Sequence, residues 1–171
     1  GINAEYGDRM NLVYVLHPNI EKSKRCAEVL EHIKTLQNVE IRYIPQDFKY
    51  TEENVRNEQQ IMLKASKIVY LYPVYWWDIP GHAKMFLDMV FQPDFAYMNG
   101  KEHHACLKGK SFKAVMTTGG PSAFYQDISI LTNKQKQIYG DYMGMSIDEP
   151  FIYFSDQSKE VLCNLSFENR V

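Results

Sequence analysis

The sequence contains an anion-binding segment in "HPNIEKSKRC", residues 17–26. Ser23 is suited to cap the helix that follows, and the free N–H groups of a first helical turn attract an anion such as a phosphate. Lys24 and Arg25 add positive charge beside this turn. The segment has neither a GxGxxG nor a Walker glycine-lysine pattern, so we do not expect a standard dinucleotide site or P-loop. Taken alone, a plain helix cap beside solvated basic residues is the alternative interpretation.

Two further segments offer surfaces for a planar ligand. In "PVYWWDIP", residues 73–80, two adjacent tryptophans stand between prolines. The prolines favour an extended path and lack a backbone donor, so neighbouring main-chain groups and aromatic rings are free to meet a flat polar partner. In "TTGGPSAFY", residues 117–125, two glycines allow close approach of the backbone and hydroxyl groups offer hydrogen bonds. Aromatic core packing and a tight glycine turn are the alternatives for each segment taken singly.

Alternating strand and helix patterns surround these segments. Five β-rich apolar stretches are predicted as strands, and apolar residues at helical spacing follow each of the first four. The predicted strands are residues 11–16, 39–44, 67–72, 111–120 and 150–155. The first predicted helix is capped by Ser23, the second is capped by Thr51, the third follows Pro80 and the fourth spans residues 132–142. A short closing helix is predicted at residues 161–165. This alternation is typical of an α/β protein with a parallel sheet covered on both faces.

The three chemical segments follow the first, third and fourth predicted strands. In an open parallel sheet, ligands bind beyond the carboxyl ends of the strands, where the strand order reverses. We therefore expect the three segments to surround a single crevice. The longer connection at residues 92–110 carries further aromatic side chains and is a candidate functional loop.

Composition excludes several other classes of protein. A chain of 171 residues with 45% hydrophobic and 23% charged residues fits one globular domain, and a net charge of −2 gives no general attraction to nucleic acid. The longest apolar run, residues 68–77, is half of the about 20 residues that a membrane span needs. Three widely spaced cysteines indicate free thiols and a cytoplasmic location.

Two minor features complete the reading of the chain. Residues 1–9 are polar and aperiodic, so we interpret them as an expression remnant and predict a single domain over residues 10–171. The adjacent His103 and His104 lack further close ligands in the sequence. We therefore predict no metal site.

The three segments together resemble the NAD(P)H:quinone oxidoreductase family with the flavodoxin-like fold. The resemblance is to the DT-diaphorase type and, more closely, to small bacterial members that include ancillary subunits of glutathione-gated potassium efflux systems. The matching pieces are "LHP" with Ser23, "PVYWWDIPGHAK", "FAY" at residues 95–97, "LKGK" at residues 107–110 and "TTGGPSAFY". The resemblance implies an α/β flavodoxin-like three-layer sandwich, with a five-stranded parallel sheet of order 2-1-3-4-5 and helices on both faces. It also implies a homodimer with its active sites at the subunit interface.

The resemblance further implies a noncovalent FMN, with FAD as the alternative, NAD(P)H as co-substrate and a quinone or similar aromatic acceptor. The residues implied for the flavin phosphate are His17, Ser23, Lys24, Arg25 and Cys26. Those implied for the flavin ring are Pro73, Val74, Tyr75, Trp76 and Trp77 along one edge, and Thr117, Thr118, Gly119, Gly120 and Tyr125 at its pyrimidine side. On this interpretation the tryptophans wall the ring and anchor their loop in the core.

Two catalytic roles follow as hypotheses from spacing and resemblance. Tyr125 and the neighbouring glycine amides would stabilise the negative charge of the reduced flavin. Trp76, Tyr97 and Phe124 would form an aromatic box that orders the nicotinamide and then the quinone over the ring.

Two positions depart from the family's pattern. Many relatives carry S-x-x-N in the first segment, whereas Cys26 stands at its last position here, which predicts a weaker affinity for flavin. The DT-diaphorase type has a histidine shortly after the position of Tyr125, whereas no histidine follows His104 here. A flavodoxin-like electron carrier and a regulatory partner of a membrane transporter are alternative functions; typical carriers are far more acidic than a net charge of −2.

Overall fold

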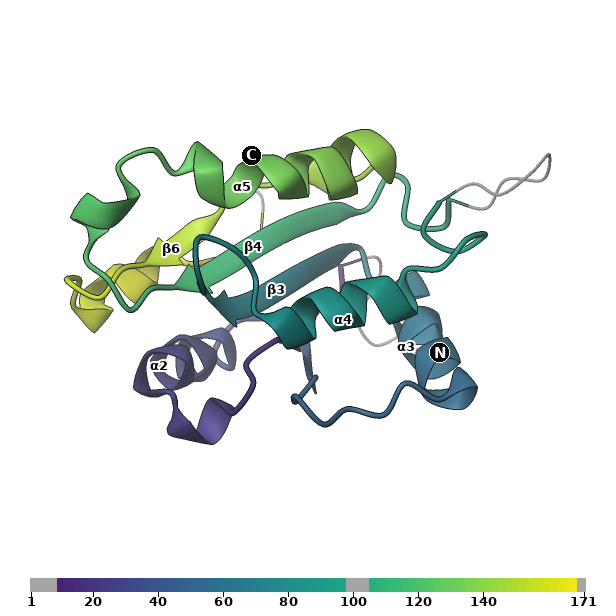
Figure 1. Ribbon diagram of the computed structural model, residues 1–171, viewed down its shortest axis with the longest axis horizontal. Helices are drawn as coiled ribbons and strands as arrows, with labels where there is room; N and C mark the ends of the chain where they lie inside the picture. The colour runs from purple at the N-terminus through teal and green to yellow at the C-terminus, as the bar shows by residue number, and fades with distance from the viewer. Residues whose placement is uncertain (1–8, 98–104, 169–171) are drawn as a thin grey trace.

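A parallel sheet forms the centre of the molecule in the computed structural model, which describes residues 9–97 and 105–168 (Figure 1). The strand order is β2-β1-β3-β4-β5, with β6 also paired to β4. The strands are β1 (Asn11–Val15), β2 (Val39–Tyr43), β3 (Lys67–Pro73), β4 (Ser111–Thr117), β5 (Ser146–Ile147) and β6 (Phe151–Tyr153). All these pairs are parallel, so the predicted order 2-1-3-4-5 is confirmed.

The edge next to β4 differs from the single fifth strand that the sequence predicted. The two-residue β5 pairs with the start of β4, and β6 pairs with its end, from Val115 to Thr117. The predicted strand at residues 150–155 therefore accounts for β6 alone. The chain leaves the sheet between β5 and β6. This connecting segment has too few apolar residues to produce a strand pattern in the sequence.

Helical segments connect the strands. They are η1 (Ile20–Lys22), α2 (Lys24–Ile33), α3 (Glu52–Leu63), α4 (Gly81–Val90), η2 (Ser122–Tyr125), α5 (Ser129–Gln135), η3 (Lys136–Tyr142) and η4 (Lys159–Asn164). Ser23 and Thr51 cap α2 and α3 with their side chains, as predicted. The helix predicted at residues 132–142 instead begins at Ser129 and continues as a π-helix, η3. The closing helix is a 3-10 helix, η4.

The strands separate two hydrophobic layers. Because successive strand residues point to opposite faces, Leu12 and Tyr14 pack with α3, α4, α5 and η3, whereas Val13 and Val15 pack with α2 and η4. The predicted three-layer sandwich is therefore confirmed. In Figure 1 the loop between β3 and α4 arches beyond the end of β3, at the edge where the sequence places its chemical segments.

The first layer contains a buried ion pair. Glu58, of which 1% of the side chain is exposed, accepts from Arg42 Nε at 2.5 Å and from Arg42 Nη2 at 2.6 Å. The hydroxyl of Tyr14 lies 3.2 Å from the same carboxylate. The ion pair raises the pKa of the Arg42 guanidinium, and it links β2, at the sheet edge, to α3.

Candidate functional site

A cleft of about 610 Å³ lies at the carboxyl ends of β1, β3 and β4. The three predicted segments meet in it. Its lining comprises His17, Pro18, Asn19, Lys22, Ser23, Lys24 and Arg25 after β1, Pro73, Val74 and Tyr75 after β3, and Thr117, Thr118 and Gly119 after β4. The predicted single crevice is therefore present. Of the residues implied for the flavin, five do not line it, namely Cys26, Trp76, Trp77, Gly120 and Tyr125, and the predicted catalytic residue Tyr97 does not line it either.

The first segment forms the N-terminal turn of α2. The Ser23 hydroxyl accepts from the Cys26 amide at 3.1 Å, so that amide is not free for a ligand. Cys26 itself is fully buried, and its Sγ lies 3.2 Å from Thr117 Oγ1. Burial raises the pKa of the Cys26 thiol. The Cys26 side chain, at the position where many relatives have asparagine, thus faces the interior. Its contact with Thr117 connects the first and third segments.

The basic residues of this segment divide into two kinds. Arg25 donates through Nη2 to the carbonyl oxygens of Ser155 and of Gln157, the latter at 2.9 Å, and its guanidinium lies 4.1 Å from the centre of the Tyr153 ring. Its side chain therefore holds the segment after β6 against α2. Lys22 and Lys24 are exposed along the cleft and are the cations placed to attract an anion there.

The two tryptophans form a tight turn. Tyr75 and Asp78 exchange both backbone hydrogen bonds, at 3.0 Å each, while Trp76 and Trp77 have φ values of +52° and +61°. This is the geometry of a type I′ turn, which usually requires asparagine or glycine. Trp76 is 90% exposed and Trp77 43% exposed. The predicted extended path, and the prediction that the tryptophans anchor the loop in the core, are therefore wrong.

The second and third segments present free backbone donors. The Val74 amide donates to the Thr117 carbonyl at 2.8 Å, which fixes the two segments side by side. Thr118 turns its hydroxyl inward, donating to the Gly120 carbonyl at 2.7 Å. Within residues 9–97 and 105–168, no protein acceptor meets the amides of Trp76, Trp77, Gly119 and Gly120. Free amides on two adjacent loops suit the polar edge of a planar heterocycle.

Aromatic rings extend from the cleft in one direction. The Tyr125 ring lies 5.7 Å from that of Trp77 and 6.0 Å from that of Phe154, a residue that sequence reasoning missed. Phe124 is exposed beside Gly120, where an added Cβ would lie 2.6 Å from Phe124 Cδ2. Tyr97 instead packs against Tyr142, with ring centres 5.6 Å apart. The predicted box of Trp76, Tyr97 and Phe124 is therefore not assembled within one chain.

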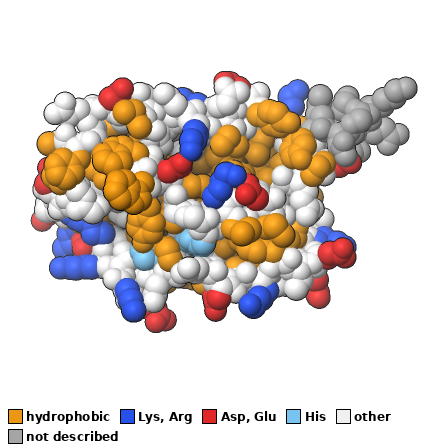
Figure 2. Space-filling model, viewed as in Figure 1, with side chains coloured by type: hydrophobic (Ala, Val, Ile, Leu, Met, Phe, Trp, Pro, Cys, Tyr) orange, Lys and Arg blue, Asp and Glu red, His pale blue; other side chains and the backbone are white. Residues whose placement is uncertain are grey.

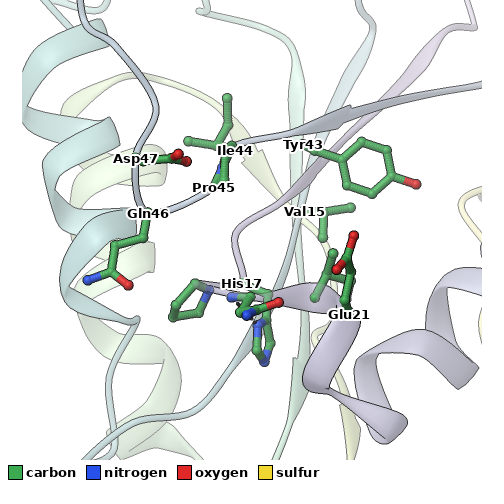
Figure 3. A pocket seen from close by; sticks show the side chains of 11 residues that line it. Val15, His17, Glu21, Tyr43, Ile44, Pro45, Gln46 and Asp47 are labelled. Carbon is green, nitrogen blue, oxygen red and sulfur yellow. Dashed lines mark hydrogen bonds between the residues drawn. The ribbon is translucent and has the colours of Figure 1, made fainter.

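His17 lines the cleft after β1, and His82 is near enough to interact with it electrostatically. His17 Nδ1 accepts from the Asn19 amide at 2.9 Å, and His82, on the first turn of α4, has its Nε2 3.1 Å from the Ile44 carbonyl oxygen. Burial lowers the pKa of both imidazoles, and the charge of His82 lowers that of His17 further. Sequence reasoning missed the proximity of His82 to His17, because His82 belongs to the pattern of a helix that follows β3. A second hollow adjoins His17 between the ends of β1 and β2 (Figure 3).

Other predicted features have simpler outcomes. Within the described residues, no cluster of histidine, cysteine, aspartate or glutamate side chains has the makings of a metal site. His103 and His104 lie outside the described residues, as does part of the candidate loop at residues 92–110. The described helices include none with the length and apolar character of a membrane span.

A parallel sheet of this order, with a ligand cleft where the order reverses, defines a flavodoxin-like protein. The chain belongs to the family described as having a flavodoxin-like fold, whose sequence model matches residues 11–162. It is 34% identical over 116 residues to the glutathione-regulated potassium-efflux system ancillary protein KefF of Enterobacter sp. (strain 638), a match that covers 68% of this chain and 64% of that protein. The predicted resemblance to these bacterial proteins is confirmed.

Solved structures share the fold at lower sequence identity. An NADPH-quinone reductase from P. pentosaceus superposes with a TM-score of 0.74 at 22% identity, covering 91% of this chain and 94% of its own. General stress protein 14 from Treponema denticola, in complex with FMN, has a TM-score of 0.74 at 19% identity and covers 90% of this chain and 91% of its own. The arrangement of strands and helices is thus common to these proteins.

Proposed function

We propose that the protein is an FMN-dependent NAD(P)H:quinone oxidoreductase. The observation that carries the proposal is the cleft, in which a capped helix N-terminus with two exposed lysines faces the loops after β3 and β4. The free amide of Gly119 belongs to the cleft lining, and those of Trp76, Trp77 and Gly120 belong to the same two loops. An anionic phosphate suits the first feature, and a flat ring with polar edges suits the second. The descriptions of the fold relatives, an NADPH-quinone reductase and an FMN complex, support this assignment.

The protein's residues would bind and orient the reactants. FMN, when bound, supplies hydride acceptance from NAD(P)H and two-electron reduction of a quinone. The His17 imidazole, Lys22, Lys24 and the first amides of α2 would hold the phosphate. The amides of Gly119 and Gly120 would donate to the pyrimidine side of the ring and stabilise the negative charge of the reduced flavin. The exposed rings of Trp76 and Phe124 give nicotinamide and quinone an apolar surface on which to stack.

A homodimer completes this site. Tyr97 lies with Tyr142 beside the groove between α4 and η3, away from the cleft of its own chain. Figure 2 shows hydrophobic side chains in patches across this face, and the exposed ones include Ile130 and Tyr142. Packing two copies through this face would cover the patches and bring Tyr97 of one protomer toward the cleft of the other. Light scattering, with a loss of dimer in Ile130→Asp, tests this arrangement.

A regulatory role is the second candidate function. The 34% identity to a potassium-efflux ancillary protein favours it, and in that role the same fold docks on a membrane transporter. An electron carrier is a third, and co-purification with a transporter or slow reaction with NAD(P)H separates these functions from that of a free-standing enzyme.

Anaerobic stopped-flow absorbance tests the proposal. FMN-reconstituted protein is mixed with NADPH or NADH, and then with benzoquinone. Rapid bleaching of the flavin followed by rapid recovery is the expected result. Tight FMN binding with only slow bleaching would instead favour the carrier or regulatory function, and a protein that binds no FMN would contradict all flavin-based functions.

A further inference from the structure

The proposed function leaves one buried imidazole nitrogen unexplained. His82 Nδ1 is buried and has no hydrogen-bond partner in the part of the chain that the structure describes. A buried polar atom without a hydrogen-bond partner lowers the stability of the fold. The ring stands at the start of α4, tied by Nε2 to the end of β2, and interacts electrostatically with His17 of the cleft. Figure 2 shows histidine side chains close together on this face.

The hydrogen-bond partners assign the protons of both rings. A carbonyl oxygen accepts, so His82 Nε2 carries a proton and its Nδ1 has the lone pair. A backbone amide donates, so His17 Nδ1 has the lone pair and its Nε2 carries the proton. Adding a proton to His17 Nδ1 would break the hydrogen bond from Asn19. Adding one to His82 Nδ1 breaks none.

The charged groups that line the two hollows together with His17 come from the loops after β1 and β2. Lys22 and Lys24 line the cleft together with His17. Glu21 and Asp47 line the adjoining hollow of about 600 Å³ (Figure 3). In the described part of the chain, no carboxylate is among the groups that shift either pKa. Burial therefore disfavours the charged form of both imidazoles.

We propose that His82 takes up a proton when the phosphate of FMN binds beside His17, so that cofactor binding is linked to pH. The inference rests on the proposed function and adds a positioning residue to it. His17 keeps its Nε2 proton and uses that N–H group to form a hydrogen bond to the phosphate. His82 Nδ1, in contrast, accepts a proton from solvent. The new positive charge on His82 neutralises part of the charge of the phosphate dianion, which loses its second proton at about pH 6.

The sign of the linkage follows from the two states. Burial holds the pKa of His82 below its ordinary value in the apoprotein, and a neighbouring dianion raises it. Between these two pKa values the complex binds more protons than the free protein. FMN affinity therefore rises as pH falls through this interval, by up to about tenfold per pH unit when one full proton is taken up.

Calorimetric titration of FMN into the apoprotein near pH 7, in buffers of different ionisation enthalpy, measures this proton uptake directly. We expect the binding enthalpy of the natural chain to depend on the buffer. His82→Gln should remove that dependence, because the amide can still donate to the Ile44 carbonyl but cannot be protonated. His32→Gln is the matched control: His32 lies on α2, with its Nε2 3.0 Å from the Leu165 carbonyl oxygen, and its loss should leave proton uptake unchanged.

Riboflavin, which lacks the phosphate, provides the ligand control and should bind without proton uptake. FMN binding with no buffer dependence would overturn the inference while leaving the proposed function intact. Equal uptake in the natural chain and in His82→Gln would overturn it as well, because the proton would then belong to the phosphate or to another group. Failure of FMN to bind at all would overturn the proposed function and this inference together.

Discussion

Replacing Trp76 by asparagine should stabilise the fold while weakening the site. A residue other than glycine, asparagine or aspartate in the left-handed conformation costs about 1–2 kcal/mol, and Trp76 has a φ of +52°. Asparagine tolerates this conformation and is preferred at the first central position of a type I′ turn. Because Trp76 is 90% exposed, its removal sacrifices little buried surface. We expect Trp76→Asn to raise the free energy of unfolding by about 1 kcal/mol, or Tm by about 2–4 °C.

Trp77→Asn is the matched control, because Trp77 has a φ of +61° but its ring packs 5.7 Å from Tyr125. The same relief of backbone strain is then offset by lost aromatic packing, worth about 0.5–1.5 kcal/mol besides the apolar area. Urea unfolding measures both variants, and flavin reduction by NADPH should slow in Trp76→Asn. A lower stability of Trp76→Asn at every protein concentration would refute the strain argument.

Three further substitutions or reactions test other parts of the structure. Arg42→Met leaves the buried Glu58 carboxylate unpaired and should lower the free energy of unfolding by about 3–5 kcal/mol in urea, with much of the loss recovered when Glu58 is also changed to methionine. Gly119→Ala adds a Cβ that has no protein atom within 4 Å but would meet a ligand in the cleft, so FMN affinity should fall about tenfold with Tm unchanged. A fall in Tm without a change in affinity would show that this Cβ does not contact the ligand. Because Cys26 is buried and burial raises the pKa of its thiol, a thiol reagent should modify exposed Cys163 promptly and Cys26 only on unfolding; prompt reaction of both would show that Cys26 becomes accessible in the folded protein.

Much of the fold follows from periodic patterns in the sequence. The strands β1 to β4 are continuous apolar or alternating runs, and Ser23 and Thr51 mark two helix starts by their capping chemistry. The edge beside β4 was predicted poorly because two very short strands share one position there. The strand order came from the resemblance to a family, since periodicity does not specify which strands are neighbours.

For the candidate site, the positions of the loops could be predicted from the sequence, but the directions of several side chains could not. The three loops were found because parallel strands bring their carboxyl ends to one edge, whatever the side chains do. Side-chain directions were harder to predict. Cys26 turned inward and Arg25 was engaged by carbonyl groups, and neither result is encoded in spacing alone. The general tendency of aromatic side chains to be buried predicts Trp76 and Trp77 in the core, whereas a strained turn exposes them.

The turn at residues 75–78 also determines which part of this protein tryptophan fluorescence reports on. Trp76 and Trp77 are the two tryptophans of the 171-residue chain, and their ring centres lie 6.5 Å apart. Tryptophan emission from the protein therefore originates entirely beside the cleft. A bound flavin would accept excitation from both indoles, so emission should fall with each ligand molecule that binds and reappear when it leaves. Unfolding of the distant core would need a different chromophore, for which the buried tyrosines of the sheet are suited.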